Sequence, residues 1–195
     1  MSSALNVVAL IGSPTSSANS RTLLLVRQVL DQLRHRLHID VQWVELAPIA
    51  RSLGQALTRE EVEPRIEQAL QRIEAADLLI AAAPVYRGSY PGLFKHLVDF
   101  IGLEALVDVP VLLAATGGSE RHALVIDHQL RPLFSFFQAR TLPLGVYATD
   151  KDFVDYRLRD DALINRASLA VQRALPLLPW ARHAQASRAG VVALA

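Results

Sequence analysis

Residues 78–92 read LLIAAAPVYRGSYPG, and this stretch decides the predicted fold. Its first part, residues 78–83, is an uninterrupted apolar run long enough for one buried strand. The remainder carries two prolines, two glycines, two tyrosines and an arginine, and a segment with helical apolar spacing follows at Leu93, Leu97, Phe100 and Ile101. We predict a central parallel strand whose carboxyl end opens into a ligand-binding loop. The alternative is a Pro/Gly turn with incidental aromatic residues.

The segments on both sides of this stretch repeat the alternation of strand and helix. Apolar runs predict four more strands, at residues 6–11, 39–46, 109–115 and 142–147. Helical spacing predicts helices over residues 23–37, 58–73, 93–101, 122–138 and 160–178. Thr58 and Glu61 form a capping-box pattern, and Asp160-Asp161 opens the last helix. Residues 48–57 are expected to be irregular, and residues 148–159 to form an exposed loop.

The loop after the first strand, residues 12–22, reads GSPTSSANSRT. Hydroxyl side chains and the free N–H groups of a helix N-terminus together suit a phosphate group. Ser20 is also a good N-cap for the helix, and the two roles are compatible. The loop matches neither the G-x-G-x-x-G nor the G-x-x-x-x-G-K-[ST] pattern, which disfavours a dinucleotide site and a nucleotide P-loop. The pattern favours a mononucleotide.

A second glycine-rich loop, Thr116 to Ser119, follows the fourth strand. A glycine pair directly after a buried strand suggests a ligand pressed against the backbone. The next helix contains Pro132, which has no N–H to donate and clashes with the carbonyl of His128. We therefore predict a kink or a π-bulge near His128.

The composition restricts the function classes further. The 195-residue chain carries a net charge of +1 with interspersed charges, so we expect no nucleic-acid partner. It has no cysteine, which excludes disulfides, thiolate catalysis and iron–sulfur clusters, and its histidines lack metal-ligand spacing, so we expect no metal. No run is apolar enough to cross a membrane and no signal peptide is visible, so we expect a cytoplasmic protein. We predict one domain over residues 1–180 and a C-terminal tail, residues 181–195, that is partly disordered or packs on a partner.

Five strands alternating with helices predict a doubly wound α/β domain, with the flavodoxin-like five-stranded parallel order 2-1-3-4-5. The loop motifs, in this order, resemble those of the NADPH-dependent FMN reductases. Within that family they resemble the reductase components of two-component alkanesulfonate and methanesulfonate monooxygenases. The motifs that carry the resemblance are Gly12-Ser13-Pro14 with Ser20, Pro84-Val85-Tyr86 with Tyr90 and Gly92, and Ala115-Thr116-Gly117-Gly118 with His122, Asp127 and Pro132.

The resemblance implies an NAD(P)H:FMN oxidoreductase that uses NADPH or NADH and supplies reduced FMN to a partner flavin-dependent monooxygenase. It implies a homodimer or homotetramer, and it places His128 in an inserted π-helical turn at the subunit interface, as a flavin-exchange residue. No covalent catalytic residue is expected. The implied FMN-binding residues are Ser13, Ser20, Arg21 and Thr22 at the phosphate, Pro84, Val85, Tyr86, Arg87 and Gly88 along the ribityl chain and ring, and Thr116, Gly117, Gly118 and Ser119 beside the ring.

Three alternatives stay open at this point. A quinone or azo-dye reductase on the same scaffold would keep its FMN bound. A flavodoxin-type electron carrier is disfavoured, because flavodoxins are usually strongly acidic and carry a Thr/Ser-x-Thr-Gly-x-Thr phosphate loop, and this chain has neither feature. A regulatory module that retains the fold without the chemistry is the third, since a fold does not entail a function.

Overall fold

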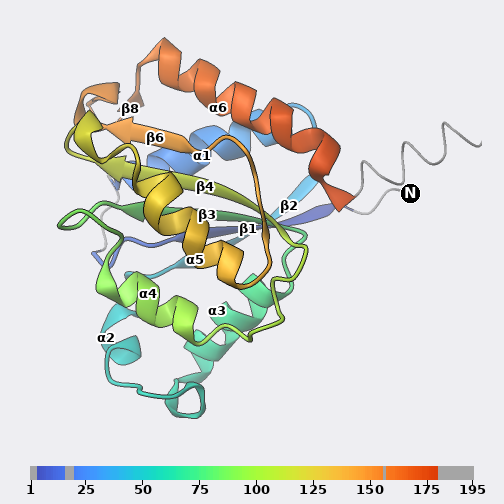
Figure 1. Cartoon of the computed structure of the whole chain (residues 1–195), viewed down its shortest axis with the longest axis vertical. Coiled ribbons are helices and arrows are strands. Elements are labelled where there is room, and N and C mark those ends of the chain that lie inside the picture. Colours follow the sequence, from blue (N-terminus) through green and yellow to red (C-terminus); the bar gives the residue numbers. More distant parts are fainter. Residues whose placement is uncertain (1–3, 16–19, 156, 180–195) are drawn as a thin grey trace, which may run out of the picture.

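The computed structural model describes residues 4–15, 20–155 and 157–179. Its centre is a parallel sheet between two layers of helices (Figure 1). The strands are β1 (Leu5–Ile11), β2 (Ile39–Glu45), β3 (Leu78–Pro84), β4 (Pro110–Gly117), β5 (Arg140–Thr141) and β6 (Val146–Thr149). The order is β2-β1-β3-β4-β5, with β6 also paired to β4. This confirms the predicted doubly wound fold and its order.

Strands β1 and β3, next to each other in the sheet, are buried on both faces because nearly all of their residues are apolar. In the middle of the sheet Ala9 of β1 lies opposite Trp43 of β2 on one side and Ile80 of β3 on the other. Helices cover both faces of such a strand, so it needs no polar face. All paired strands of this sheet run parallel, so their carboxyl ends and the loops that follow lie along one edge, on the left in Figure 1.

The helices form two unequal layers. Their bounds are α1 (Arg21–Arg34), α2 (Ala50–Leu53), α3 (Pro64–Glu74), α4 (Gly92–Asp99), α5 (Arg131–Phe136) and α6 (Asp161–Ala174). Helices α1 and α6 pack against one face of the sheet, and α2 to α5 pack against the other (Figure 1). The predicted inner face of α3, which consists of Ile66, Ala69, Leu70 and Ile73, is buried as its spacing requires.

Both long helices on the α1 side begin at the side-chain caps that their sequences predict. The Ser20 hydroxyl accepts a hydrogen bond from the Leu23 N–H at 3.3 Å, and the Asp160 carboxylate accepts one from the Leu163 N–H at 2.8 Å. Each cap satisfies one of the N–H groups that the first turn of a helix leaves without an intrahelical partner.

The fifth strand position differs from the prediction of one strand over residues 142–147. Two short strands, β5 and β6, occupy it, with Pro143 between them. Proline has no N–H for the ladder, so pairing with β4 stops and resumes after Gly145. The segment after β6 is not a plain loop either, because it holds a 3-10 turn (Asp150–Asp152) and the hairpin of β7 (Phe153–Val154) and β8 (Arg157–Leu158).

Two smaller predictions also need correction. The region expected to be irregular, residues 48–57, contains the short helix α2. The capping pattern at Thr58 and Glu61 precedes a 3-10 turn, Arg59–Glu61, and α3 begins only at Pro64. The predicted tail, residues 181–195, and residues 16–19 of the first loop lie outside the described residues.

The helix predicted over residues 122–138 is broken where Pro132 suggested. A 3-10 turn (Glu120–His122) is followed by a π-helical segment (Ile126–Leu130), which runs into α5. The Arg131 N–H donates to the Ile126 carbonyl, five residues back, which widens the turn ahead of the proline. The predicted π-bulge near His128 is confirmed. Leu124, expected on the buried side, is exposed because the helix is not continuous.

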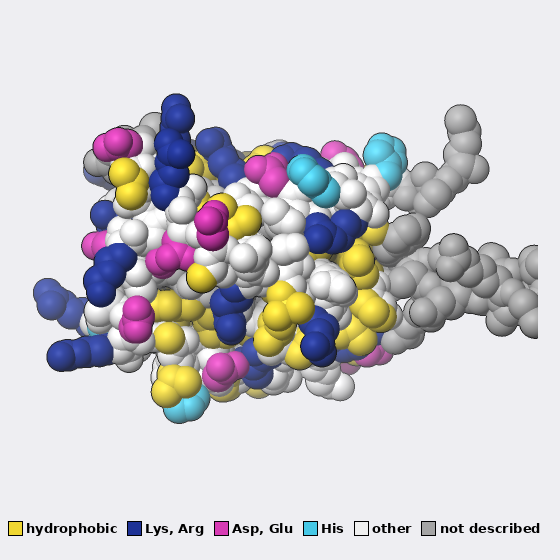
Figure 2. Space-filling view, turned by 90° about the horizontal axis from the view of Figure 1, so that it is seen from above, with side chains coloured by type: hydrophobic (Ala, Val, Ile, Leu, Met, Phe, Trp, Pro, Cys, Tyr) yellow, Lys and Arg dark blue, Asp and Glu magenta, His cyan; other side chains and the backbone are white. Residues whose placement is uncertain are grey.

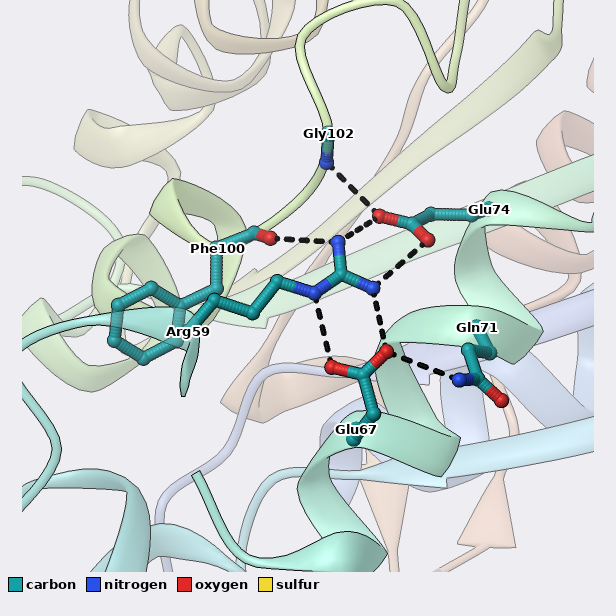
Figure 3. Close-up of polar contacts among 6 residues, drawn as sticks. All are labelled: Arg59, Glu67, Gln71, Glu74, Phe100 and Gly102. Atoms are coloured by element: carbon teal, nitrogen blue, oxygen red, sulfur yellow. Dashed lines mark hydrogen bonds and ion pairs between the residues drawn. The ribbon is translucent and has the colours of Figure 1, made fainter. Parts of the chain in front are cut away.

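A cluster of charged side chains connects α3 to the backbone that follows α4 (Figure 3). The Arg59 guanidinium donates to the Glu67 carboxylate at 2.8 and 2.9 Å, to the Glu74 carboxylate at 2.5 and 3.1 Å, and to the Phe100 carbonyl at 3.1 Å. Glu74 also accepts from the Gly102 N–H at 2.9 Å. These bonds raise the pKa of Arg59 and lower the pKa of Glu67, so both groups stay charged at neutral pH.

The surface on the α6 side carries charges of both signs. Figure 2 shows basic and acidic side chains interspersed over this face, with apolar side chains between them. Within residues 4–15, 20–155 and 157–179, none of the helices is both long and apolar enough to traverse a membrane.

Candidate functional site

The loops at the carboxyl edge of the sheet enclose a cavity of about 470 Å³. Loops that follow β1, β3, β4 and β6 all contribute to it, so residues far apart in the chain meet there. The lining residues are Ser13, Thr15, Ser20, Arg21, Thr22, Pro84, Val85, Tyr86, Thr116, Gly117, Gly118 and Asp150. A cavity at this edge, where the strand order reverses between β1 and β3, is the usual ligand site of such sheets.

The first wall is the loop after β1 and the start of α1. Ser13 is buried, and its hydroxyl donates to the Thr15 carbonyl at 3.2 Å. Ser20 caps α1, and no acidic residue stands in the first turn of that helix. Hydroxyl groups, an arginine and the first N–H groups of α1 are therefore gathered here, and together they suit an anion.

Arg21 is held by a carboxylate that the sequence analysis did not include in the site. Its guanidinium forms an ion pair with Asp150 at 2.8 Å, and the two side chains are 45% and 51% exposed. Asp150 comes from the turn after β6. The only available signal was its place directly after the fifth apolar run, which a parallel sheet brings to the same edge.

Thr22 is part of the cavity floor and has a structural partner. Its hydroxyl lies 2.8 Å from the hydroxyl of Thr116 at the end of β4, and both side chains are buried. This bond joins the first turn of α1 to the sheet. Thr22 and Thr116 line the cavity as predicted, and because one hydroxyl donates to the other, one of the two O–H donors is left for a ligand.

The second wall is a tight turn in the loop after β3. The Tyr86 N–H donates to the Ser89 carbonyl at 2.7 Å, and the Ser89 N–H donates back to the Tyr86 carbonyl at 3.2 Å. Arg87 and Gly88, at φ +52° and +89°, form the tip, as a type I′ turn requires. The turn brings Pro84, Val85 and Tyr86 into the lining and leaves Arg87 and Gly88 outside it.

The third wall is the glycine pair after β4. A Cβ atom on Gly117 would lie 2.3 Å from the Tyr147 hydroxyl, whereas one on Gly118 would meet nothing within 4 Å. The glycine at 117 is therefore needed by the fold, while Gly118 faces open space. The Tyr147 hydroxyl donates to the Ser119 carbonyl at 2.6 Å, and burial, with the charges of Asp150 and Asp152, raises the pKa of Tyr147.

The π-helical segment touches this site through one side chain. The Ser89 hydroxyl donates to the Gln129 side-chain oxygen at 3.1 Å, which links the tight turn to the π segment. The neighbouring His128 is exposed and does not line the cavity.

The cavity thus brings together ten of the thirteen predicted binding residues. Arg87, Gly88 and Ser119 belong to the same loops but lie outside the lining. Thr15 and Asp150 were missed. Among the residues that the structure describes, no three His, Cys, Asp or Glu side chains gather as metal ligands would.

Comparisons with known proteins show the family to which the chain belongs. The family model of "NADPH-dependent FMN reductase" matches residues 5–154. The chain is 62% identical over 177 residues to an NADH-dependent FMN reductase, SfnF, of Pseudomonas fluorescens, covering 91% of this chain and 94% of that protein. It is 55% identical over 177 residues to an NADPH-type FMN reductase of Pseudomonas aeruginosa, with the same coverage.

A comparison with solved structures finds the same fold in an oxidoreductase. An oxidoreductase from Corynebacterium diphtheriae superposes with a TM-score of 0.78 at 30% identity, over 90% of this chain and 98% of that one.

Proposed function

This chain belongs to the NADPH-dependent FMN reductase family, and from that premise we propose that it reduces FMN by hydride transfer from NADH or NADPH and releases the reduced flavin to a partner monooxygenase. The enzyme is an NAD(P)H-dependent FMN oxidoreductase. The hydride step, the release of flavin and the partner are the proposed parts.

The observation that carries the proposal is the donor set of the main cavity. Ser20 and Arg21 supply hydroxyl and guanidinium donors along one wall, next to the N-terminus of α1. The Ser13 hydroxyl lies on the same wall and would turn from the Thr15 carbonyl to a bound phosphate. Such donors fit the phosphate of a mononucleotide. We assign these three residues to the phosphate of FMN.

The other walls fit a flat ring. Pro84, Val85 and Tyr86 offer apolar and aromatic surface, and Gly118 leaves the backbone open to a close approach. A volume of about 470 Å³ lies within the range of roughly 300–1,000 Å³ that is typical of small-ligand sites. We assign the isoalloxazine to this side of the cavity.

Bound FMN would supply the redox chemistry by accepting a hydride at N5 from the nicotinamide. The residues of the chain bind the flavin, orient it and leave one side of it accessible. No nucleophile or general acid is required from the protein, and we assign none.

Release of reduced FMN is favoured by an open site. Tyr86 at the rim is 42% exposed, and Asp150 places a carboxylate beside the proposed phosphate donors. Both features favour a flavin that exchanges over one that is permanently held. The sulfonate monooxygenase partner rests on the resemblance of the loop motifs alone. The second candidate, a quinone or azo-dye reductase, would need the opposite behaviour, a retained flavin.

We also propose a homo-oligomer. Phe136 is 68% exposed and lines an apolar groove of about 410 Å³ together with Ile101, Leu103, Leu133 and Phe137. An exposed aromatic in an apolar groove is suited to covering by another chain, and a second copy is the partner that the resemblance implies. The interface role of the exposed His128 belongs to the same proposal, and the cytoplasmic location stays a prediction.

The test is steady-state oxidation of NADH and NADPH by protein freed of flavin by gel filtration, with and without added FMN. Activity that depends on free FMN and saturates with it supports supply of reduced flavin. Flavin that co-elutes with the protein, with turnover that needs a quinone or an azo dye, supports the second candidate. Absence of oxidation under both conditions contradicts the proposed function.

A further inference from the structure

A second, smaller cavity of about 220 Å³ adjoins the main one at the same edge of the sheet. Its lining residues are Ser119, Glu120, Arg121, Thr149 and Lys151. They belong to the loops after β4 and β6, the same loops that give Gly117, Gly118 and Asp150 to the main cavity. The two cavities are therefore neighbours, because consecutive residues, Gly118 and Ser119 on one loop and Asp150 and Lys151 on the other, line different cavities.

The smaller cavity is held open by bonds within the fold. Tyr147 fixes the Ser119 carbonyl with a 2.6 Å hydrogen bond. On the other loop, the Asp152 carboxylate accepts from the Thr149 N–H at 2.6 Å and from the Thr149 hydroxyl at 3.1 Å. Thr149 is also paired in register with Gly117. Both loops are anchored before any ligand arrives.

Its charge favours an anion. Arg121 and Lys151 are exposed, and within the described residues neither of them forms an ion pair. Glu120 is the one acidic residue of the lining, so the lining carries a net charge of +1 at neutral pH. A guanidinium and an ammonium beside a serine hydroxyl suit a phosphate group. The volume lies below the roughly 300 Å³ typical of a whole ligand, so the cavity fits one group of a larger molecule.

We propose that this cavity binds a phosphate group of the pyridine dinucleotide, Arg121 and Lys151 being its ligands. This inference rests on the proposed function, because the nicotinamide must reach the flavin in the main cavity. A dinucleotide whose nicotinamide lies there has to extend over the rim, and this is the basic hollow next to that rim. Both dinucleotides carry a pyrophosphate, and NADPH carries an additional 2′-phosphate.

The experiment compares the double variant Arg121→Ala/Lys151→Ala with the parent. The control is Arg51→Ala, which removes an exposed arginine on α2, outside both cavities. We measure KM and kcat for NADH and for NADPH at saturating FMN, the Kd of FMN by fluorescence, and the binding of NADP⁺ and NAD⁺ by calorimetry. Exposed charge-assisted contacts predict a rise in KM of about 5- to 30-fold, with kcat and the Kd of FMN unchanged. Raising the salt concentration should raise the parent KM and leave that of the double variant nearly constant.

Two outcomes support the site and identify the group. A similar rise in KM for NADH and NADPH assigns the pyrophosphate, and a rise for NADPH alone assigns the 2′-phosphate. In either case Lys151→Glu should raise the KM for the dinucleotide more than Lys151→Ala does, because it replaces the positive charge by a negative one. An unchanged KM for both dinucleotides, as in Arg51→Ala, overturns the inference. Calorimetry separates failure of this inference from failure of the proposed function, because it measures NAD(P)⁺ binding without turnover. Binding that is weakened in the double variant supports the site even if the protein has no activity. Binding that is the same in the double variant and the parent overturns the inference.

Discussion

Two arginines of this protein, Arg59 and Arg21, are used in opposite ways. Arg59 makes five hydrogen bonds to two carboxylates and a carbonyl, and its side chain is 30% exposed. Arg21 has a single carboxylate partner and is about half exposed at the main cavity. A guanidinium whose donors are satisfied within the fold stabilises structure, whereas one with donors to spare is available to a ligand. The comparison predicts that the two regions respond differently to the same substitution.

The largest expected effect is on stability, at Arg59. Arg59→Ala leaves two partly buried carboxylates, Glu67 and Glu74, without their partner. Exposed pairs contribute about 0–1 kcal/mol and buried ones about 3–5 kcal/mol, so we expect a loss of about 2–3 kcal/mol in the free energy of unfolding. Urea denaturation measures it. Arg65→Ala, which breaks a half-exposed pair with Glu63, is the matched control and should cost less than about 1 kcal/mol.

FMN affinity should be unchanged in both variants. A loss of flavin binding in Arg59→Ala beyond that in Arg65→Ala would contradict the separation of the two regions.

The reciprocal effect is on binding, at Arg21. Arg21→Ala should weaken the binding of FMN by about 10- to 100-fold, because hydrogen bonds to a charged group contribute about 1.5–3 kcal/mol. Its unfolding free energy should change by less than about 1 kcal/mol, as for other exposed pairs. Fluorescence titration with FMN and with riboflavin checks it. Riboflavin lacks the phosphate, and its affinity should stay the same. Equal losses for both flavins would remove Arg21 from the phosphate site.

A smaller effect of opposite sign is expected at Asp150. Its carboxylate competes with a phosphate for Arg21 and repels it. Asp150→Asn should therefore tighten FMN binding by about 2- to 5-fold, the range of an exposed charge interaction, and leave riboflavin binding unchanged. Weaker FMN binding in the variant would mean that Asp150 orients Arg21 for the phosphate. It would disprove the competition between Asp150 and the phosphate for Arg21.

The smallest effect is a pH dependence at Glu67. Arg59 lowers the pKa of Glu67 below its ordinary value of 4.5. A carboxyl with a lowered folded-state pKa adds stability above its unfolded pKa and loses it as the pH falls through the folded one. The difference in urea midpoint between the parent and Arg59→Ala should therefore shrink below about pH 4.5. A difference that stays constant from pH 7 to pH 3.5 would show that Arg59 acts through packing alone.

The sequence predicted those parts of the molecule that depend on local pattern. The inner face of α3 follows from apolar residues at helical spacing, and the π segment follows from one residue, Pro132, which cannot donate a hydrogen bond. The ten predicted residues that line the cavity were implied by the resemblance of the loop motifs, and they meet because the carboxyl ends of parallel strands share an edge.

The remainder depends on contacts between distant segments. The fifth strand is split into β5 and β6, and a plain apolar run did not predict that break. The Arg59 cluster joins residues up to 41 positions apart in the sequence, and no spacing rule links them. Gly117 lines the cavity as predicted, but the fold also requires a glycine there because a Cβ atom would clash with Tyr147, thirty residues later in the chain.

The pairing of α1 with α6 on one face of the sheet has a consequence for synthesis. The face covered by α2 to α5 can close as soon as β4 and α5 have left the ribosome, because its helices follow their strands directly. The α1 face closes only when α6 has emerged and covered the apolar residues of α1 and β6. Until then a nascent chain leaves the part of this face beside α1 exposed, and exposed apolar surface of this kind is prone to aggregation. Docking of α6 is therefore a late step in the folding of this protein during translation.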